Sequence, residues 1–381
     1  MFQKFAILGL VLTMVAGCME SNPHPAKDYP EPFYGQLFYE DALISATPQQ
    51  ITARVIGDSV GAVQQVYMVP SEMAQADTPQ AAIMELPIDA GIDNEGKYLY
   101  VMEKNSFKTN KYDLSTGELS LELNTAAENK ATSHLGKGIR VMSDDELWIH
   151  GVDAGKVFRI TPQDELLGYW EGRSGDSFIK MTSGALVQTT SSNEHELFHV
   201  FDTEGEKQRS FGILSSYQIE IDGYKTVGHG LGFHGWTTTN GDDSFIHVAN
   251  MGGGLLSFNT DGSLRYFREF VEHVPFPGTV PTGENTRGID MDGVHTQHMA
   301  LNVWEDVYYE YAINVNSGER IIDAYDYNTG DYLSSIPHPE GCWVKFVTDS
   351  EVYAMCENGF SKLERVPLED DMLNTVSFAA N

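Results

Sequence analysis

Cysteine and basic residues are both scarce in this chain. Among 381 residues there are 3 cysteines, and 24 Lys and Arg stand against 55 Asp and Glu, which gives a formal net charge of −31. A field of this sign repels polyanions, so the composition argues against nucleic acid as a partner. The excess acid is interpreted as a solvated surface that keeps the protein soluble.

Long apolar runs and helical periodicity are also lacking. The run Phe5 to Ala16 is too short to cross a bilayer as a helix and follows Lys4, which is typical of a signal peptide over residues 1–17. The polar, proline-bearing stretch 18–48 is predicted to be a flexible tether. Short alternating runs, 36 Gly and 18 Tyr then indicate an all-β protein.

Catalytic signatures are missing as well. The chain has no G-x-S-x-G elbow, no H-E-x-x-H, no CxxC and no phosphate-binding glycine loop between a strand and a helix. The run Gly252-Gly253-Gly254 is predicted to be a hairpin turn. An enzymatic activity is therefore left open, and a non-enzymatic role is favoured.

What the sequence does contain is a repeated turn. Tyr112-Asp113-Leu114-Ser115-Thr116-Gly117-Glu118 returns in three variants, and each follows an alternating apolar run, as in a hairpin. The variants begin at Phe201, Phe258 and Tyr327, whereas one unit has Thr161-Pro162-Gln163-Asp164 in place of the glycine turn.

A second recurring element gives the number of units. Six strand-like runs follow acidic or glycine turns, and they begin at Gly96, Asp145, Gly184, Asp243, Asp306 and Ser350. Units of this length with short strands predict a six-bladed β-propeller over residues 49–370, followed by a C-terminal tail, 371–381. The last unit lacks a strand, which one from residues 50–70, for example 51–55, could supply to close the ring. The alternative is a seven-bladed ring in which residues 50–88 form their own blade.

With these units in place, the chain resembles the bacterial six-bladed propellers of the TolB-like or NHL-like kind, in a lipoprotein format. Val15-Ala16-Gly17-Cys18 matches the lipobox of bacterial lipoproteins, which implies lipid attachment at Cys18. In that family an Asp after the cysteine retains the protein at the inner membrane. This chain has Met19 there, which implies the cell envelope and the outer membrane as its location.

The two remaining cysteines, Cys342 and Cys356, lie symmetrically about a turn expected at Asp349. Antiparallel pairing about that turn would also match Val344 with Ala354 and Phe346 with Val352, with these side chains on one face. Since an exported protein meets an oxidising compartment, a cross-strand disulfide is predicted.

Histidines recur near the start of the predicted innermost strands, where the blades meet at one channel mouth. They are His134, His234, His298 and His338, with His229 and His295 as reserves. Converging imidazoles suit a transition metal, zinc above all. Some NHL-type propellers, such as the peptide amidoglycolate lyases, hold a metal with channel histidines, but the resemblance is one of position only. The alternative is that these histidines form no site. They would then lie in loops between blades, which tolerate polar residues, and would cap turns or hydrogen-bond to the backbone.

Two functional hypotheses follow. The favoured one is a lipid-anchored binding or assembly module whose loop-rich face receives a protein, peptide or glycan, with the membrane reached only through the anchor. The other is a metal-binding propeller, acting as a metal carrier or as an enzyme of the lyase or hydrolase type. Long connections at 215–239 and 273–292 would build the loop-rich face.

Overall fold

A computed structural model describes residues 36–40, 42–51, 53–68, 87–93, 95–103, 109–124, 139–142, 146–151, 156–171, 177–190, 196–215, 218–221, 224–227, 233, 235–272, 279–283, 286–289, 296–356, 359–368 and 374–376. The elements of regular structure in this part of the chain are strands. A search of the same residues finds no helix of the length and hydrophobicity that crossing a membrane requires.

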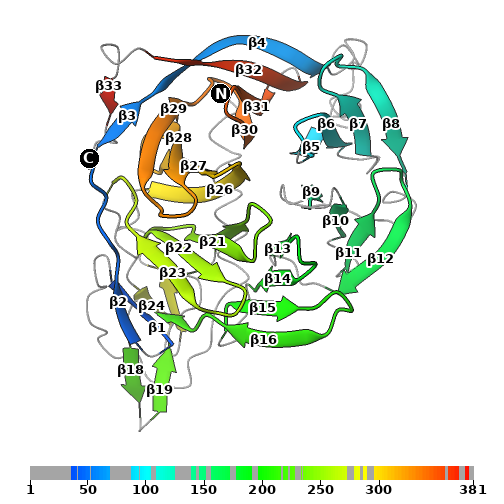
Figure 1. The fold of residues 1–381 in the computed structure, drawn as a ribbon. Coiled ribbons are helices and arrows are strands. Elements are labelled where there is room, and N and C mark those ends of the chain that lie inside the picture. The colour runs from blue at the N-terminus through cyan, green and yellow to red at the C-terminus, as the bar shows by residue number, and fades with distance from the viewer. Residues whose placement is uncertain are drawn as a thin grey trace.

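Six sheets surround a common centre, so the fold is a six-bladed β-propeller, as predicted (Figure 1). Each of the first four blades is an antiparallel meander of consecutive strands, the first innermost and the fourth outermost. Blade 1 has β5 (Pro87–Ile92), β6 (Tyr98–Glu103), β7 (Thr109–Asp113) and β8 (Leu119–Leu123). Blade 2 has β9 (Ile139–Val141), β10 (Leu147–Gly151), β11 (Lys156–Ile160) and β12 (Leu166–Glu171). Blade 3 has β13 (Ser177–Lys180), β14 (Leu186–Thr189), β15 (Phe198–Phe201) and β16 (Lys207–Phe211). Blade 4 has β20 (Gly235–Thr238), β21 (Ser244–Ala249), β22 (Leu255–Asn259) and β23 (Leu264–Arg268).

The last two blades take strands from the N-terminal part of the chain. Blade 5 has β26 (Thr296–Trp304), β27 (Val307–Asn314), β28 (Arg320–Asp326) and β29 (Tyr332–Pro337), extended by β3 (Arg54–Ile56) and β33 (Asn374–Val376). Blade 6 has β30 (Trp343–Val347), β31 (Glu351–Cys356), β32 (Gly359–Pro367) and, as its outermost strand, β4 (Asp58–Met68).

Ring closure by an N-terminal strand is therefore confirmed, but the closing strand is β4 and not residues 51–55. Arg54–Ile56 instead join blade 5, where Ile56 pairs in parallel with Ser335. The seven-bladed alternative is wrong, because β3 and β4, which would have belonged to a seventh blade, complete blades 5 and 6.

Further strands lie outside the blades. β1 (Gln36–Tyr39) and β2 (Ala42–Ser45) form a sheet with β17 (Leu214–Ser215). The two long connections contain the hairpins β18 (Gln218–Ile221) with β19 (Tyr224–Val227) and β24 (Thr279–Gly283) with β25 (Thr286–Ile289). Because β1, β2 and β33 also pair with other strands, the folded unit extends beyond residues 49–370 at both ends.

The repeated glycine turn joins the third and fourth strands of its blade. Gly117, Gly205, Gly262 and Gly330 all have positive φ, between 72° and 89°. In the unit without glycine, Asp164 takes the same conformation with φ 73°, since Asp tolerates the left-handed region better than most residues. The pairing register shifts beside all five of these turns, so one bulged hairpin recurs around the ring.

The glycines also leave room for the preceding blade. A Cβ on Gly205 would lie 2.9 Å from Trp170, one on Gly262 would lie 3.1 Å from Phe211, and one on Gly330 would lie 2.7 Å from Tyr266. In each case an aromatic side chain of one outermost strand packs on the next blade's turn. The repeat therefore encodes packing between blades as well as the turn itself.

The core is divided among the junctions between blades. The described residues contain six buried hydrophobic clusters, and each joins two neighbouring blades around the ring. Leu37 of β1 is fully buried in the cluster between blades 3 and 4, so the N-terminal segment contributes to the core.

The predicted disulfide is present between Cys342 and Cys356, with their Cα atoms 4.1 Å apart. Val344 pairs with Ala354 as expected, but Phe346 pairs with Tyr353 and not with Val352. A register shift between Val344 and Phe346 is the reason. Phe346 consequently packs in the cluster between blades 6 and 1, on the other face of the sheet.

Candidate functional site

Only two of the histidines predicted to bind a metal are described by the structure. His134 and His234, with the reserves His229 and His295, lie outside the described residues. His298 lies within the long innermost strand β26 rather than before it. His338 does precede the innermost strand of its blade, β30.

His298 is fully buried between blades 4 and 5. Its ring stacks on Phe270 with centroids 3.6 Å apart, and its Nδ1 lies 3.1 Å from Oε1 of Glu310. Burial lowers the pKa of His298 to about 3 and raises the pKa of Glu310 to about 8. At neutral pH the pair is therefore an uncharged imidazole beside a protonated carboxyl.

His338 packs on the opposite side of blade 5. It meets the ring of Tyr311, with centroids 5.3 Å apart, and Tyr311 belongs to the core between blades 5 and 6. Burial, assisted by Arg320, lowers the pKa of His338 to about 4. His298 and His338 thus lie in two different junctions between blades.

Within the described part of the chain, no group of three or more His, Cys, Asp or Glu side chains is arranged to hold a metal. The ring of four histidines stays a prediction, because two of its members are outside that part. Elemental analysis of the purified protein tests it directly.

A buried ionic cluster lies beside His298 in blade 5. Arg54 of β3 is fully buried and forms a bidentate ion pair with Asp323, both nitrogen–oxygen distances being 2.9 Å. A second ion pair joins Arg54 to Glu272. Burial lowers the pKa of Arg54, but Asp323 and Glu272 raise it by more, so the guanidinium stays charged. Ser335 also donates to Asp323 at 2.6 Å, and the cluster fastens the N-terminal segment to the blade.

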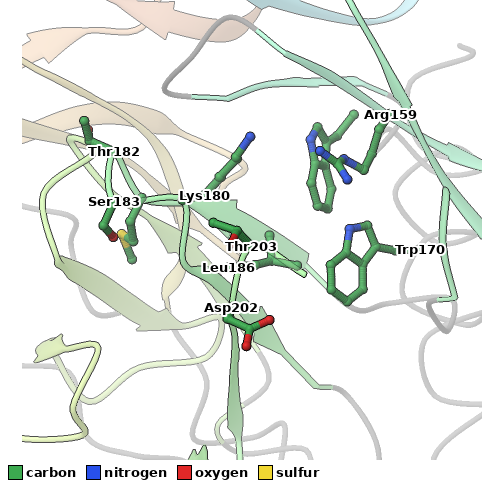
Figure 2. Close-up of a pocket in the computed structure, with 11 residues that line it drawn as sticks. Arg159, Trp170, Lys180, Thr182, Ser183, Leu186, Asp202 and Thr203 are labelled. Carbon is green, nitrogen blue, oxygen red and sulfur yellow. The ribbon is translucent and has the colours of Figure 1, made fainter. Parts of the chain in front are cut away.

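An open pocket of about 260 Å³ lies between blades 2 and 3. Blade 2 contributes Trp148, Arg159 and Trp170, and blade 3 contributes the two turns at 182–184 and 202–203. Figure 2 shows Arg159 and Trp170 on one side, with Lys180, Asp202 and Thr203 across from them. Both turns join strands on the side of the disc opposite the long connections, because strand direction alternates through each blade.

The aromatic wall of this pocket is held in place by packing. Trp170 lies over Trp148, with ring centroids 6.4 Å apart, and meets the edge of Phe201 at 5.2 Å. Gly205 provides the space next to Trp170. Trp170 is partly exposed and Trp148 is buried, so Trp170 supplies a flat surface to the pocket.

The polar wall is centred on Glu146. This side chain is buried and forms ion pairs with Arg159 and Lys180. Lys180 Nζ lies 2.8 Å from Glu146 Oε2, and Arg159 contacts both carboxylate oxygens through Nε and Nη2. The Nη1 group of Arg159 makes no hydrogen bond to a described residue. Because Glu146 orients both side chains, Arg159 and Lys180 line the pocket beside an aromatic surface, and the Nη1 group of Arg159 is a donor that a ligand can use.

Sequence reasoning missed this pocket because the side chains that give it its chemistry are far apart in the sequence. Arg159, Trp170 and Lys180 come from three strands of two blades. The only local hint was that the unit containing Arg159 and Trp170 lacks the glycine turn. Arg54 falls within residues 50–70, the segment predicted to close the ring, but its buried partners could not be foreseen.

Comparison with known proteins gives distant structural neighbours. No family model matches the sequence, and no curated protein matches it either. A member of the DUF4221 family from Bacteroides vulgatus is similar with a TM-score of 0.47 and 8% identity, covering 85% of this chain and 100% of that one. A Bacteroides fragilis protein described as exported gives 0.46 and 9%, covering 85% and 99%. Virginiamycin B lyase from Staphylococcus aureus gives 0.42 and 10%, covering 81% and 99%. These likenesses are too distant to bear on activity or ligand.

Proposed function

We propose that this protein is a binding module and that its ligand occupies the pocket between blades 2 and 3. The observation that carries the proposal is that Trp170, a partly exposed aromatic surface, lies in one pocket with Arg159 beside it and Lys180 across from it (Figure 2). Concave sites with an apolar wall and a few oriented polar groups are where proteins bind small ligands.

The ligand class that fits best is a sugar ring carrying a carboxylate. The C–H face of a pyranose packs on an indole, and its carboxylate accepts from Arg159 Nη1 and from the ammonium of Lys180. A pocket of about 260 Å³ suits one such ring, since it is smaller than the roughly 300–1,000 Å³ of sites for larger ligands. The sequence left a protein, a peptide or a glycan open as the ligand of the loop-rich face; the glycan proposed here would bind on the opposite, turn side of the disc.

Titration with glucuronic acid, followed by tryptophan fluorescence, tests this proposal. Two tryptophans line the pocket, so binding should change the emission. Glucose is the matched probe without the carboxylate and should bind at least about tenfold more weakly, which corresponds to about 1.4 kcal/mol.

The variant Arg159→Gln should weaken glucuronic acid binding about tenfold. Arg209→Gln is the control, because Arg209 is exposed on β16 and bonds to Asp261 of blade 4. The proposal fails if glucuronic acid leaves the fluorescence unchanged, or if both variants bind it as the wild type does.

We further propose that the protein is lipid-anchored through Cys18 in the cell envelope, on the outer membrane. The lipobox at 15–18 supports the anchor, and the Cys342–Cys356 disulfide is typical of proteins from oxidising compartments. Expressed in a bacterium, the wild type should incorporate labelled palmitate and fractionate with the outer membrane. Cys18→Ser should abolish the labelling, and equal labelling of both would contradict the anchor.

A further inference from the structure

The N-terminal segment runs along the rim of the propeller and covers the outer edges of three blades. This rim strap, the described part of residues 36–68, is the blue segment that passes from β1 and β2 through β3 to β4 in Figure 1. On blade 4, Thr47 pairs in parallel with Arg268 at the end of β23. On blade 5 β3 pairs with β29, and on blade 6 β4 pairs with β32.

The strap also fastens the junctions between blades. Tyr39 donates its hydroxyl to the carbonyl of Gly262, in the rim turn of blade 4. Gln49 donates to the carbonyls of Glu269 and Gly330, both at 2.8 Å, and so joins blade 4 to the rim turn of blade 5. An extended chain can therefore dock on these rims with both backbone pairing and side-chain bonds.

Blades 1 and 2 have no such cover among the described residues. Their outermost strands, β8 and β12, each end a sheet, so one side of their backbone has no strand partner in this part of the chain. Both carry large apolar side chains that face solvent, with exposed fractions of 54% for Leu119, 45% for Leu166, 51% for Leu167 and 53% for Tyr169. An open, apolar edge strand is a template for pairing with another chain.

Blade 3 shows how charge can protect an edge that pairs with no strand of the described chain. Its outermost strand β16 begins with Lys207-Gln208-Arg209, all exposed. Charged side chains of this kind discourage strand addition. The sequences of β8 (LSLEL) and β12 (LLGYWE) contain no Lys or Arg.

The two open edges form one continuous stretch of rim. The backbone N–H of Asn124, just after β8, donates to Asp164 Oδ2 at 2.9 Å, in the turn just before β12. Figure 1 shows β8 leading into β12 along the side of the ring opposite the strap. A single extended segment could follow both strands, as the strap follows blades 4 to 6.

The charge of this stretch indicates its partner. Glu118 and Glu165 are exposed beside the apolar residues. The neighbouring cations lie over aromatic rings: Lys156 of β11 is 3.7 Å from the centroid of the Tyr169 ring, and Lys111 of β7, which pairs with Leu121, is 4.0 Å from that of Tyr98. Since the whole chain has a net charge of −31, pairing with a second copy would bring like charges together.

We propose that the open rim of blades 1 and 2 is a docking site for an extended, basic segment of another protein, which adds a strand to β8 and β12. Main-chain hydrogen bonds to the edges of β8 and β12 that pair with no described strand give the affinity, apolar side chains of the segment cover the exposed leucines, and its cations meet Glu118 and Glu165. This site is separate from the pocket between blades 2 and 3, so either can fail without the other.

A short synthetic peptide of alternating valine and lysine, with blocked ends and a fluorescent label, probes the site by anisotropy. It should bind the full chain saturably. The same peptide N-methylated at alternate residues keeps its charge but cannot form the strand ladder, and it should bind at least about tenfold more weakly. A valine and glutamate peptide should also bind at least about tenfold more weakly.

Matched variants locate the peptide. The double variant Leu119→Lys/Leu167→Lys places charges on the open edges and should weaken binding at least about tenfold. Leu333→Lys/Val366→Lys adds the same charge at exposed positions of β29 and β32, whose edges are already paired, and should retain wild-type binding.

Equal binding of the N-methylated peptide, or equal loss in both double variants, would overturn the proposal, because charge alone would then explain the affinity. A wild-type dimer in sedimentation that Leu119→Lys/Leu167→Lys dissociates would also overturn it. The occupant of the rim would in that case be a second copy of this chain.

Discussion

The rim of blades 4 and 5 and the rim of blades 1 and 2 are built from the same bulged hairpin, but their outermost strands are paired differently. On blades 4 to 6 the N-terminal strap pairs with the outer strands and contributes the buried Arg54 and Leu37. On blades 1 and 2 the described residues leave the edge open, with leucines exposed. The contrast shows that the repeat specifies a blade, whereas residues outside the repeat determine whether the edge of its outermost strand is paired.

The covered half also depends on contacts that are remote in sequence. Arg54 and Asp323 are 269 residues apart, and they join only when the ring has closed. Stability should therefore be more sensitive to single changes beneath the strap than to changes at the open edges.

The largest effect is expected from Arg54→Met, which removes the cation that holds the strap on blade 5. Asp323 is fully buried, so its carboxylate would be left without its ion-pair partner. Breaking a buried pair in this way destabilises a protein by about 3–5 kcal/mol. Urea denaturation should show a loss of this size, and hydrogen exchange should increase along residues 54–68.

Two further variants test whether the loss of stability in Arg54→Met comes from the unpaired carboxylate of Asp323 or simply from the removal of an arginine. Arg54→Met/Asp323→Asn should be more stable than Arg54→Met alone, because the unpaired carboxylate is gone. Arg209→Met, on the open edge of blade 3, should change the unfolding free energy by less than about 0.5 kcal/mol. Equal losses in Arg54→Met and Arg209→Met would remove the distinction between the two halves.

The next effect concerns the disulfide in blade 6, the blade that the strap completes. Cys342 and Cys356 are separated by 14 positions, and closing a loop of this size contributes about 3 kcal/mol. Cys342→Ala/Cys356→Ala should lower the unfolding free energy by about 2–3 kcal/mol and keep the fold, since β4 still pairs with β32. Reduction of the wild type should give the same shift in urea, and a change within error would contradict the prediction.

A smaller effect should appear as a dependence on pH, from the buried pair beneath the strap. Folded Glu310 holds its proton up to its pKa of about 8, whereas the unfolded chain loses it near pH 4.5, so stability falls as pH rises between these values. His298 is protonated near pH 6.5 when unfolded and at its pKa of about 3 when folded, so stability falls as pH decreases below 6.5. Between pH 4.5 and 6.5 the two slopes oppose each other.

Glu310 alone acts between pH 6.5 and 8, and over that interval the unfolding free energy should decrease by about 2 kcal/mol. Glu310→Gln cannot ionise but can still bond to His298, so it should lose this alkaline decrease. Parallel curves for wild type and Glu310→Gln across the interval would show that the carboxyl at Glu310 is not the group responsible.

Much of the fold was predictable because the repeat is local. All six predicted second strands are present, and each glycine turn lies where the pattern placed it. The errors fall where a single extra residue matters: the bulge before Phe346 moved its partner from Val352 to Tyr353. The closing strand was misplaced within 50–70 because only Gly57 separates β3 from β4, and only tertiary pairing assigns the two strands to different blades.

The candidate site was much less predictable. Histidine spacing suggested a shared position, but His298 and His338 face different junctions, because His298 lies within β26 of blade 5 whereas His338 lies in the connection from β29 to β30, between blades 5 and 6. The pocket residues Arg159 and Lys180 belong to different blades. Their common partner Glu146 becomes evident only when the ring brings the blades together.

The smallest expected effect is the difference between alanine substitutions at two glycines. Gly205 lies beside the pocket between blades 2 and 3, and Gly318 lies in the turn between β27 and β28. Gly205 (φ 89°) would place a Cβ 2.9 Å from Trp170, whereas Gly318 (φ 75°) has nothing within 4 Å. Alanine at either position should cost about 1–2 kcal/mol for the left-handed backbone. Gly205→Ala should cost about 1 kcal/mol more, because Trp170 must shift, and its tryptophan emission should change while that of Gly318→Ala does not. Equal losses in urea with unchanged emission would mean that the glycine repeat serves the turn alone and not the packing of one blade on the next.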